Sequence, residues 1–313
     1  MLVNSCMAGA VEFEAVSKAY AGKRAVDSLT FAIPEGSLYG FIGPNGSGKT
    51  TTLRLMLRIL HPDQGAIRVL GRREGQALDD RTGYLPEERG LYRRMRVRDV
   101  LCFHANLKGV RDPHSRVQTW LQRLDLADRA DARISSLSKG LAQKVQFAAA
   151  VVHDPKLLVL DEPFSGLDPV SMEGLRDIIL QLKQAGTTVV FSTHDMVMAE
   201  RLCDAVLMLH RGRKVLDGSV ERLKRERGSE SIRVRFADDQ IELSDPDIVR
   251  VRNYGREQVL ELRFEAEPQA VLHRLMQRGK LLSFEVVRPS LHELFVDIAG
   301  APAAGTREDS VDV

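Results

Sequence analysis

The sequence predicts an α/β protein built on a mixed sheet flanked by helices, with an antiparallel β subdomain, a helical subdomain and a small C-terminal α+β domain. Three observations support this prediction. Buried-strand patterns alternate with helical patterns between residues 157 and 210, as in a parallel sheet. A glycine-rich loop joins a buried strand to a helix near residue 45. After residue 218, short alternating strands accompany a single helical segment.

The composition is that of a globular protein without a strong charge bias. The 313 residues are enough for one large domain and a small one, and the net charge of +2 gives no general attraction for nucleic acid. The three cysteines, Cys6, Cys102 and Cys203, have neither metal-site nor disulfide-framework spacing, as expected in a reducing cytosol. No apolar run approaches the ~18 residues of a membrane span, and no secretory leader is expected.

The main domain is expected to cover residues 10–220, after a disordered segment 1–9. A helical, arginine-rich subdomain is expected at about residues 88–140. The helix after the glycine-rich loop is expected at 51–59, and a turn at 21–22 separates the first two strands. The expected strands of this domain are 11–16, 26–33, 37–43, 65–71, 157–161, 187–193 and 205–209.

An accessory α+β domain is expected at residues 221–300, after a charged bridge at 219–230. It combines three alternating strands with a helix at 268–278. Its expected strands are 231–236, 259–264 and 281–287. The final residues, 301–313, have the small and polar composition of a disordered tail.

The stretch "GPNGSGKTT" has the composition of a phosphate-binding loop. Its glycines allow the backbone to curl so that successive N–H groups point toward phosphate oxygens. A lysine brings positive charge to the β- and γ-phosphates, and a threonine hydroxyl can bind Mg²⁺. The following helix favours negative charge at its N-terminus. The residues of the loop are Gly43, Pro44, Asn45, Gly46, Ser47, Gly48, Lys49, Thr50 and Thr51.

Acidic residues follow a second buried strand, in "LLVLDEP". An acid at the end of such a strand, Asp161, can hold Mg²⁺ beside the phosphates, and the next one, Glu162, can polarise an attacking water. His194 ends a later strand, in "STHD". Each of these residues alone is typical of a polar strand end, but their order and spacing after a phosphate loop favour nucleotide hydrolysis.

At these residues the sequence resembles the ATP-binding subunits of ABC transporters, over residues 11–220. The resemblance implies an ABC-type P-loop ATPase core, with the Walker A motif at 43–51 and the Walker B motif at 157–161. It implies catalytic roles for Glu162 as the base, for His194 as the switch histidine and for Lys49. It also implies that Asp168 belongs to the D-loop and that Tyr20 stacks on adenine. ATP and Mg²⁺ are the implied substrate and metal, with Thr50 and Asp161 as metal ligands.

The family's signature motif matches imperfectly at "LSKGL". Ser138 and Gly140 are kept, while Lys139 replaces a glycine and Leu141 replaces a polar side chain. In the family, this motif contacts the γ-phosphate of the ATP held by a partner cassette. Ser138 is expected to cap the following helix, whose N-terminus can receive that phosphate.

Glu87, in "GYLPEERGLY", occupies the place where the family has a glutamine that reaches Mg²⁺ and the attacking water. A carboxylate is a harder, charged ligand for Mg²⁺, so Glu87 can replace the glutamine; the alternative is a solvent-facing side chain. The same run, and the tail at 288–300, resemble a subgroup related to sodium-efflux and drug-efflux ATP-binding subunits. The arginines that follow, at 89, 93, 94, 96 and 98, form either a solvated face or a docking surface for a membrane partner or lipid headgroups.

The resemblance implies a subunit that powers an export-type transporter through a separate membrane permease. It would work as a dimer of ATP-binding subunits, at the cytoplasmic face of the membrane, without nucleic acid. A non-transport ABC ATPase acting on ribosomes or DNA is the main alternative, but the chain has one Walker A motif and no sustained heptads. A regulatory ligand-binding module with weak ATPase activity is less compatible with Glu162 and His194.

Overall fold

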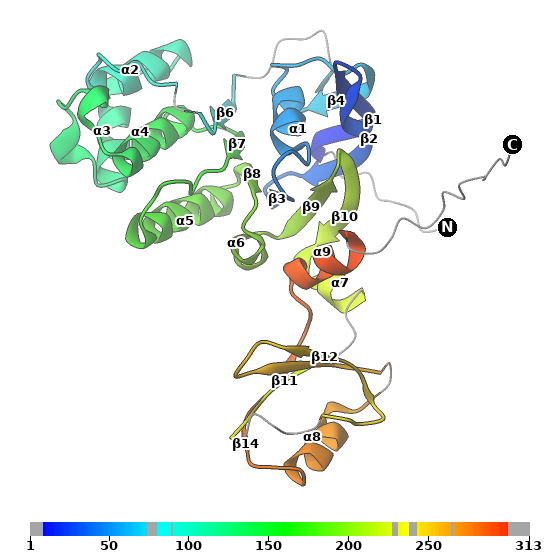
Figure 1. Ribbon diagram of the computed structural model, residues 1–313. Coiled ribbons are helices and arrows are strands. Elements are labelled where there is room, and N and C mark those ends of the chain that lie inside the picture. Colours follow the sequence, from blue (N-terminus) through cyan, green and yellow to red (C-terminus); the bar gives the residue numbers. More distant parts are fainter. Residues whose placement is uncertain are drawn as a thin grey trace, which may run out of the picture. The chain divides into compact units, whose positions relative to one another are not determined.

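The computed structural model describes residues 9–73, 80–88, 90–226, 231–237, 243–263 and 266–299 (Figure 1). Its internal contacts divide the chain into two compact units, with the boundary between Asp217 and Gly218. The expected disordered tail, 301–313, and residues 1–8 lie outside the described residues. Gly9 was expected to precede the first strand, but it belongs to that strand because its backbone pairs with Pro34.

The first unit begins with an antiparallel sheet of order β2-β1-β4-β5. Strand β1 (Gly9–Tyr20) pairs with β2 (Lys23–Pro34) and with β4 (Gln64–Val69), and β5 (Arg72–Arg73) lies at the edge. Both long strands extend beyond their predicted ranges up to the predicted turn. Register shifts let them bend while pairing continues to Tyr20 and Lys23.

A second, six-stranded sheet of order β10-β9-β3-β8-β7-β6 forms the centre of this unit. Strand β3 pairs in parallel with β8 and β9, and β7 pairs in parallel with β8 and β6. Every residue of β3, β7 and β8 is buried, as expected for strands covered on both faces. The strands are β3 (Leu38–Ile42), β6 (Thr82–Leu85), β7 (Leu157–Asp161), β8 (Thr188–Thr193), β9 (Ala205–His210) and β10 (Arg213–Ser219).

Helices surround this sheet, and α2, α3 and α4 gather to one side of it as a lobe (Figure 1). Trp120 of α3 packs edge-on against Phe147 of α4, with 6.5 Å between ring centroids. The helix after the phosphate loop starts two residues earlier than predicted, at Lys49. It also ends earlier, at Met56, and Arg58 beyond it has a left-handed φ of 56°. The helices are α1 (Lys49–Met56), α2 (Val97–Leu107), α3 (Pro113–Arg123), α4 (Lys139–Val151), α5 (Pro169–Gln184) and α6 (Met196–Leu202).

The second unit is a four-stranded antiparallel sheet of order β12-β13-β11-β14, with helix α8 contributing Val271 and Leu275 to its core. The predicted strands and helix of this unit are present. Helices α7 and α9 were not predicted. The elements are α7 (Val220–Glu226), β11 (Ser231–Phe236), β12 (Ile248–Asn253), β13 (Gln258–Leu262), α8 (Pro268–Met276), β14 (Leu281–Val287) and α9 (Leu291–Ala299).

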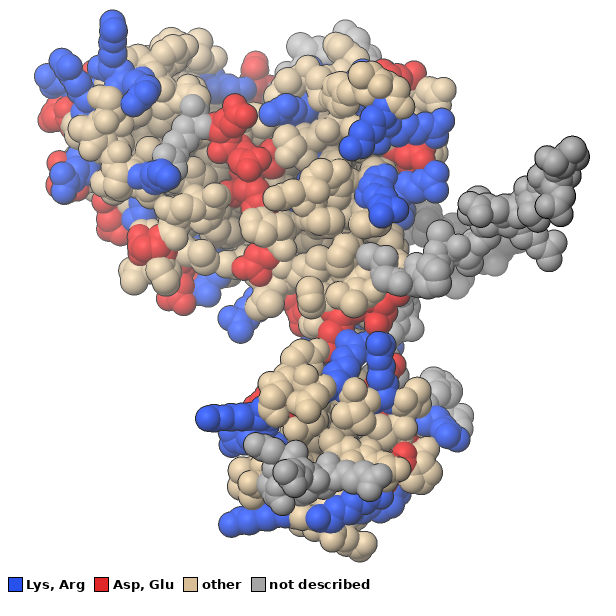
Figure 2. Space-filling view, in the orientation of Figure 1, with Lys and Arg blue, Asp and Glu red and all other residues tan. Residues whose placement is uncertain are grey.

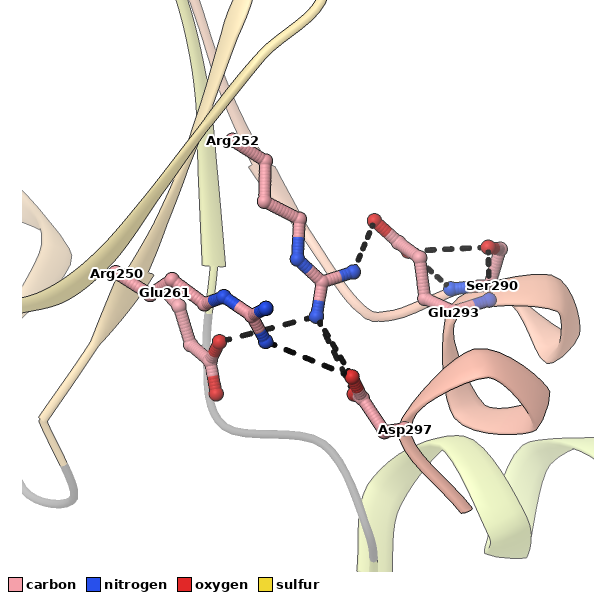
Figure 3. Close-up of polar contacts among 6 residues, drawn as sticks. All are labelled: Arg250, Arg252, Glu261, Ser290, Glu293 and Asp297. Atoms are coloured by element: carbon pink, nitrogen blue, oxygen red, sulfur yellow. Dashed lines mark hydrogen bonds and ion pairs between the residues drawn. The ribbon is translucent and has the colours of Figure 1, made fainter. Parts of the chain in front are cut away.

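Strand β12 was also missed, because its alternating arginines resemble an exposed loop. Figure 3 shows how these charges are accommodated. The Arg252 guanidinium lies 3.1 Å from Asp297 and 3.4 Å from Glu293, both on α9, and 3.9 Å from Glu261 on β13. Arg250 lies 3.7 Å from the same Asp297. The charges therefore connect the sheet to α9.

The parallel strands also determine where chemistry can occur in the first unit. Strands β3, β6, β7 and β8 all point the same way, so their carboxyl ends meet at one edge of the sheet. Ligands bind at this edge in open α/β sheets. The phosphate loop, the acids after β7, the histidine after β8 and the Glu87 loop after β6 all start there.

Candidate nucleotide site

The phosphate loop is shaped by close approaches of neighbouring backbone. Gly43 and Gly48 have φ angles of 149° and 106°, which favour glycine. A Cβ atom at Gly43 would lie 2.2 Å from the carbonyl oxygen of Leu209, and one at Gly48 would lie 2.5 Å from that of Ala25. The loop is also held from outside, because the Gly212 N–H donates to the Ser47 carbonyl at 2.9 Å. Larger residues at these two positions would displace the loop.

Lys49 lies at the start of α1 and is only 7% exposed. Its ammonium donates to the carbonyls of Gly43, at 2.7 Å, and Pro44, at 3.2 Å, so it folds back over the loop. Burial lowers its pKa, and the nearby charges of Glu162, Asp161 and Glu87 oppose that shift. A phosphate beside the ammonium would add further negative charge next to this buried cation.

Asp161 is buried at the end of β7, with 1% exposed. Its Oδ1 accepts a short hydrogen bond from the Ser192 hydroxyl and a long one, 3.4 Å, from the Thr50 hydroxyl. Its Oδ2 is buried and has no hydrogen-bond partner among the described residues. A buried carboxylate oxygen without a donor is costly unless a cation neutralises it. Asp161 and Thr50 therefore fit a Mg²⁺ ion.

Glu162 follows in a strained backbone conformation, with a left-handed φ of 48°. Its N–H donates to the Ser192 hydroxyl at 3.1 Å and to the Ser192 carbonyl at 3.2 Å, which holds the turn. Its Oε1 lies 2.9 Å from Nδ1 of His194, the residue that follows β8. Strain of this kind costs of order 1–3 kcal/mol and is common where a side chain must be aimed. The structure thus joins Glu162 and His194.

Lys49, Thr50, Asp161 and Glu162 line one cleft of about 740 Å³ beside the loop. Tyr20, at the end of β1, lies on its rim with 45% of its surface exposed, in position to offer its ring to a base. Figure 2 shows acidic side chains on the face of this unit between the α2–α4 lobe and the antiparallel sheet. The lining residues are Tyr20, Lys23, Arg24, Ala25, Asn45, Gly46, Gly48, Lys49, Thr50, Thr51, Glu87, Asp161, Glu162 and Arg211.

Comparisons with known proteins agree with this geometry. Residues 26–165 match the ABC transporter family model, and residues 218–299 match the model of the C-terminal domain of DrrA1-3-like ATP-binding proteins. An uncharacterized ABC transporter ATP-binding protein of Bacillus subtilis, YhaQ, is 39% identical over 289 residues, covering 91% of this chain and 97% of that protein. The chain belongs to the ABC transporter family.

Two further ABC proteins show similar relationships. The Nod factor export ATP-binding protein I of Paraburkholderia xenovorans is 35% identical over 305 residues, covering 93% of this chain and 97% of that protein. A solved ATP-binding subunit of an ABC transporter is 30% identical, with a TM-score of 0.65 over 69% of this chain and 92% of that one. The chain is accordingly an ABC transporter ATP-binding subunit, with the ATPase activity of that family.

The residues predicted to form the signature motif of this ABC subunit do not line its own cleft. Ser138 caps α4, and its hydroxyl accepts a hydrogen bond from the Leu141 N–H at 3.3 Å, as predicted. Gly140 packs against the D-loop, since its Cβ position lies 3.6 Å from the Gly166 carbonyl oxygen. The Asp168 carboxylate caps α5 by accepting from the Ser171 N–H at 3.0 Å, which lowers its pKa. None of Ser138, Gly140, Asp168 and His194 is among the cleft's lining residues.

Glu87 is exposed on the loop after β6, yet it is among the residues that line the cleft. This position is compatible with both alternatives for Glu87, a carboxylate that faces the metal and one that faces solvent. The described residues contain no cluster of three or more His, Cys, Asp or Glu side chains able to hold a metal by themselves. A Mg²⁺ ion here would take its remaining ligands from phosphate oxygens and water.

Sequence reasoning missed two groups at this site. Lys23, Arg24 and Arg211 line the cleft near Tyr20, and only their proximity in the fold reveals them. Ser192 was missed because a serine inside a buried strand carries no motif. Its hydroxyl nevertheless connects the Asp161 carboxylate to the Glu162 backbone.

We expect Ser192→Ala to raise the Mg²⁺ concentration needed for half-maximal ATPase activity by roughly tenfold. Among the described residues, Ser192 is the only donor that bonds closely to Asp161, and a lost hydrogen bond to a buried charged group costs about 1.5–3 kcal/mol. Titration of Mg²⁺ at saturating ATP measures the change. Ser37→Ala is the control, because the Ser37 hydroxyl bonds the Pro34 carbonyl outside the cleft. Equal Mg²⁺ dependence in all three proteins would contradict this role.

Proposed function

We propose that this subunit hydrolyses Mg²⁺-bound ATP as one half of a dimer and thereby drives export through a separate membrane permease. The single observation that supports the chemistry best is the convergence of Lys49, Asp161 with its unpartnered oxygen, and Glu162 on one cleft, with His194 in contact with Glu162. The export direction is supported by the relative named for Nod factor export.

The reaction assigns a separate task to each group in the cleft. The loop N–H groups and Lys49 bind the phosphate chain, and Tyr20 stacks on the adenine. Mg²⁺ held by Asp161 and Thr50 would neutralise charge on the phosphates. Glu162 accepts a proton from the attacking water while His194 holds the carboxylate in place. The water oxygen bonds to the γ-phosphorus as the bond between that phosphorus and the β–γ bridging oxygen breaks, and ADP and phosphate are released.

The position of the signature supports the dimer. Ser138 and the first turn of α4 do not face the chain's own cleft, so they are free to contact ATP bound by a second copy or a related subunit. Exposed N–H groups at the helix N-terminus would then bind the partner's γ-phosphate. Two ATP molecules would lie between two subunits, and hydrolysis would separate them.

The permease would dock on the lobe formed by α2–α4. The surface of this lobe exposes Tyr92, Phe103 and Leu107, with 5.7 Å between the ring centroids of Tyr92 and Phe103. Arg93 and Arg94 are also exposed there, whereas Arg96 and Arg98 pair with Asp131. An aromatic patch edged by arginines suits a protein partner at the membrane surface.

Each helix among the described residues is too short or too polar to cross a bilayer. We place the subunit at the cytoplasmic face, bound through this patch.

We expect Glu162→Gln to bind ATP but to hydrolyse it at least ~100-fold more slowly, and to accumulate as a dimer. The amide cannot accept the water's proton, while Asp161 still holds Mg²⁺. Size-exclusion chromatography with and without ATP, together with phosphate release, measures both effects. A variant that remains monomeric with unchanged turnover would contradict the role of Glu162.

The two alternatives for Glu87 make different predictions. If its carboxylate reaches Mg²⁺ in the closed state, Glu87→Gln should keep much of the ATPase activity and Glu87→Ala should lose about tenfold more, because only the amide still offers an oxygen. Glu87→Gln should also need more Mg²⁺, since a charge–charge attraction is lost. The same rate and Mg²⁺ dependence in all three proteins would show that Glu87 only faces solvent.

A further inference from the structure

The loop that carries Glu87 is fastened to helix α4 by one buried side chain. The Gln146 amide nitrogen donates to the carbonyl oxygen of Pro86, at 3.0 Å, and to that of Glu88, at 3.1 Å. These two carbonyls lie on either side of Glu87. Gln146 is only 4% exposed, and its own helix supplies a rigid support. One amide thus holds the backbone on both sides of Glu87.

The chemistry of the contact requires a donor at this position. Both partners are carbonyls, so the amide nitrogen must face them and the orientation of the amide follows. The amide oxygen is left buried, with no hydrogen-bond partner in the described parts of the chain. An unpartnered buried oxygen destabilises a fold, and an apolar side chain of similar size would avoid that cost. Packing alone therefore does not account for a glutamine here.

The same helix presents the signature to the other ATP. Helix α4 begins at the Ser138 cap, and Gln146 follows eight residues later, about 12 Å along the axis at 1.5 Å per residue. The helix also packs tightly on β6, since a Cβ atom at Gly83 would lie 2.2 Å from the Ala150 carbonyl oxygen. Strand β6, the Glu87 loop and α4 are therefore joined by packing as well as by hydrogen bonds.

We propose that Gln146 is a positioning residue that couples the two ATP sites of a dimer. It fixes the loop that faces the chain's own nucleotide to the helix whose N-terminus faces the partner's nucleotide. This inference rests on the proposed dimer. When Mg²⁺ and ATP draw Glu87 toward the cleft, the two hydrogen bonds carry that displacement to α4 and orient Ser138. Without these two hydrogen bonds, the loop would move toward its own nucleotide while α4 kept its position.

Gln146→Met in a Glu162→Gln background tests this proposal. Methionine has similar length, cannot donate, and removes the unpartnered oxygen. We expect the ATP concentration for half-maximal dimer formation, measured by analytical ultracentrifugation, to rise by roughly tenfold. ATP affinity at protein concentrations too low for dimers should change less than about twofold. Trp120, the chain's only tryptophan, lies against Phe147 next to Gln146, so its emission and the thermal melt report whether α4 keeps its packing.

The control is Gln143→Met, on the same helix. Gln143 is equally buried but donates to the Pro163 carbonyl, at 3.2 Å, and not to the Glu87 loop. In a Glu87→Ala background the effect of Gln146→Met should vanish, while any effect of Gln143→Met should persist. An unshifted midpoint for Gln146→Met, or a shift that persists without Glu87, would overturn the proposal.

The outcome can be separated from failure of the proposed dimer. If Glu162→Gln alone forms no ATP-dependent dimer, the dimer proposal fails, and the same mutant cycle is then run on steady-state ATPase activity with Glu162 intact. If the reductions in ATPase activity caused by Gln146→Met and Glu87→Ala multiply in the double variant, the positioning role of Gln146 is overturned. A double variant no slower than Glu87→Ala alone would support it.

Discussion

The site depends on one electrostatic constraint: Asp161 is a buried carboxylate with a donor for only one of its oxygens. Ser192 bonds Oδ1, and nothing among the described residues bonds Oδ2. Such a group needs a cation, and the cleft places Thr50 and the phosphate loop beside it. Mg²⁺ bound together with ATP would supply that charge, so substrate binding would also neutralise this buried carboxylate.

The remaining parts of the cassette are arranged around that carboxylate by the parallel sheet. The next residue, Glu162, is turned by its strained φ toward His194, while β6 delivers Glu87 from the opposite side. Helix α4 then holds both neighbouring loops through two buried glutamines, Gln143 and Gln146. The loops that carry the proposed catalytic acids and the proposed signature residues are consequently supported by the same helix, which is a physical basis for communication between sites.

Much of this architecture could be predicted from the sequence, where the signal was local. The phosphate loop, Asp161, Glu162 and His194 follow strand patterns in a fixed order, and the cap at Ser138 needs only its neighbours. Groups whose role depends on distant partners could not be predicted. The roles of Gln146, on an apolar helix, and of Arg252, in β12, can be recognised only after the fold brings their carbonyl or carboxylate partners close.

The central claim is that this cleft binds and hydrolyses ATP through Lys49 and the carboxylates around it. The most direct measurement compares Mg²⁺-dependent phosphate release by the wild-type chain and by Lys49→Ala, with ATP binding followed in parallel. Lys49 is buried, and its ammonium donates to the Gly43 carbonyl of the phosphate loop. We expect the variant to lose most ATP binding or turnover. Steady-state ATPase activity equal to that of the wild type would contradict it.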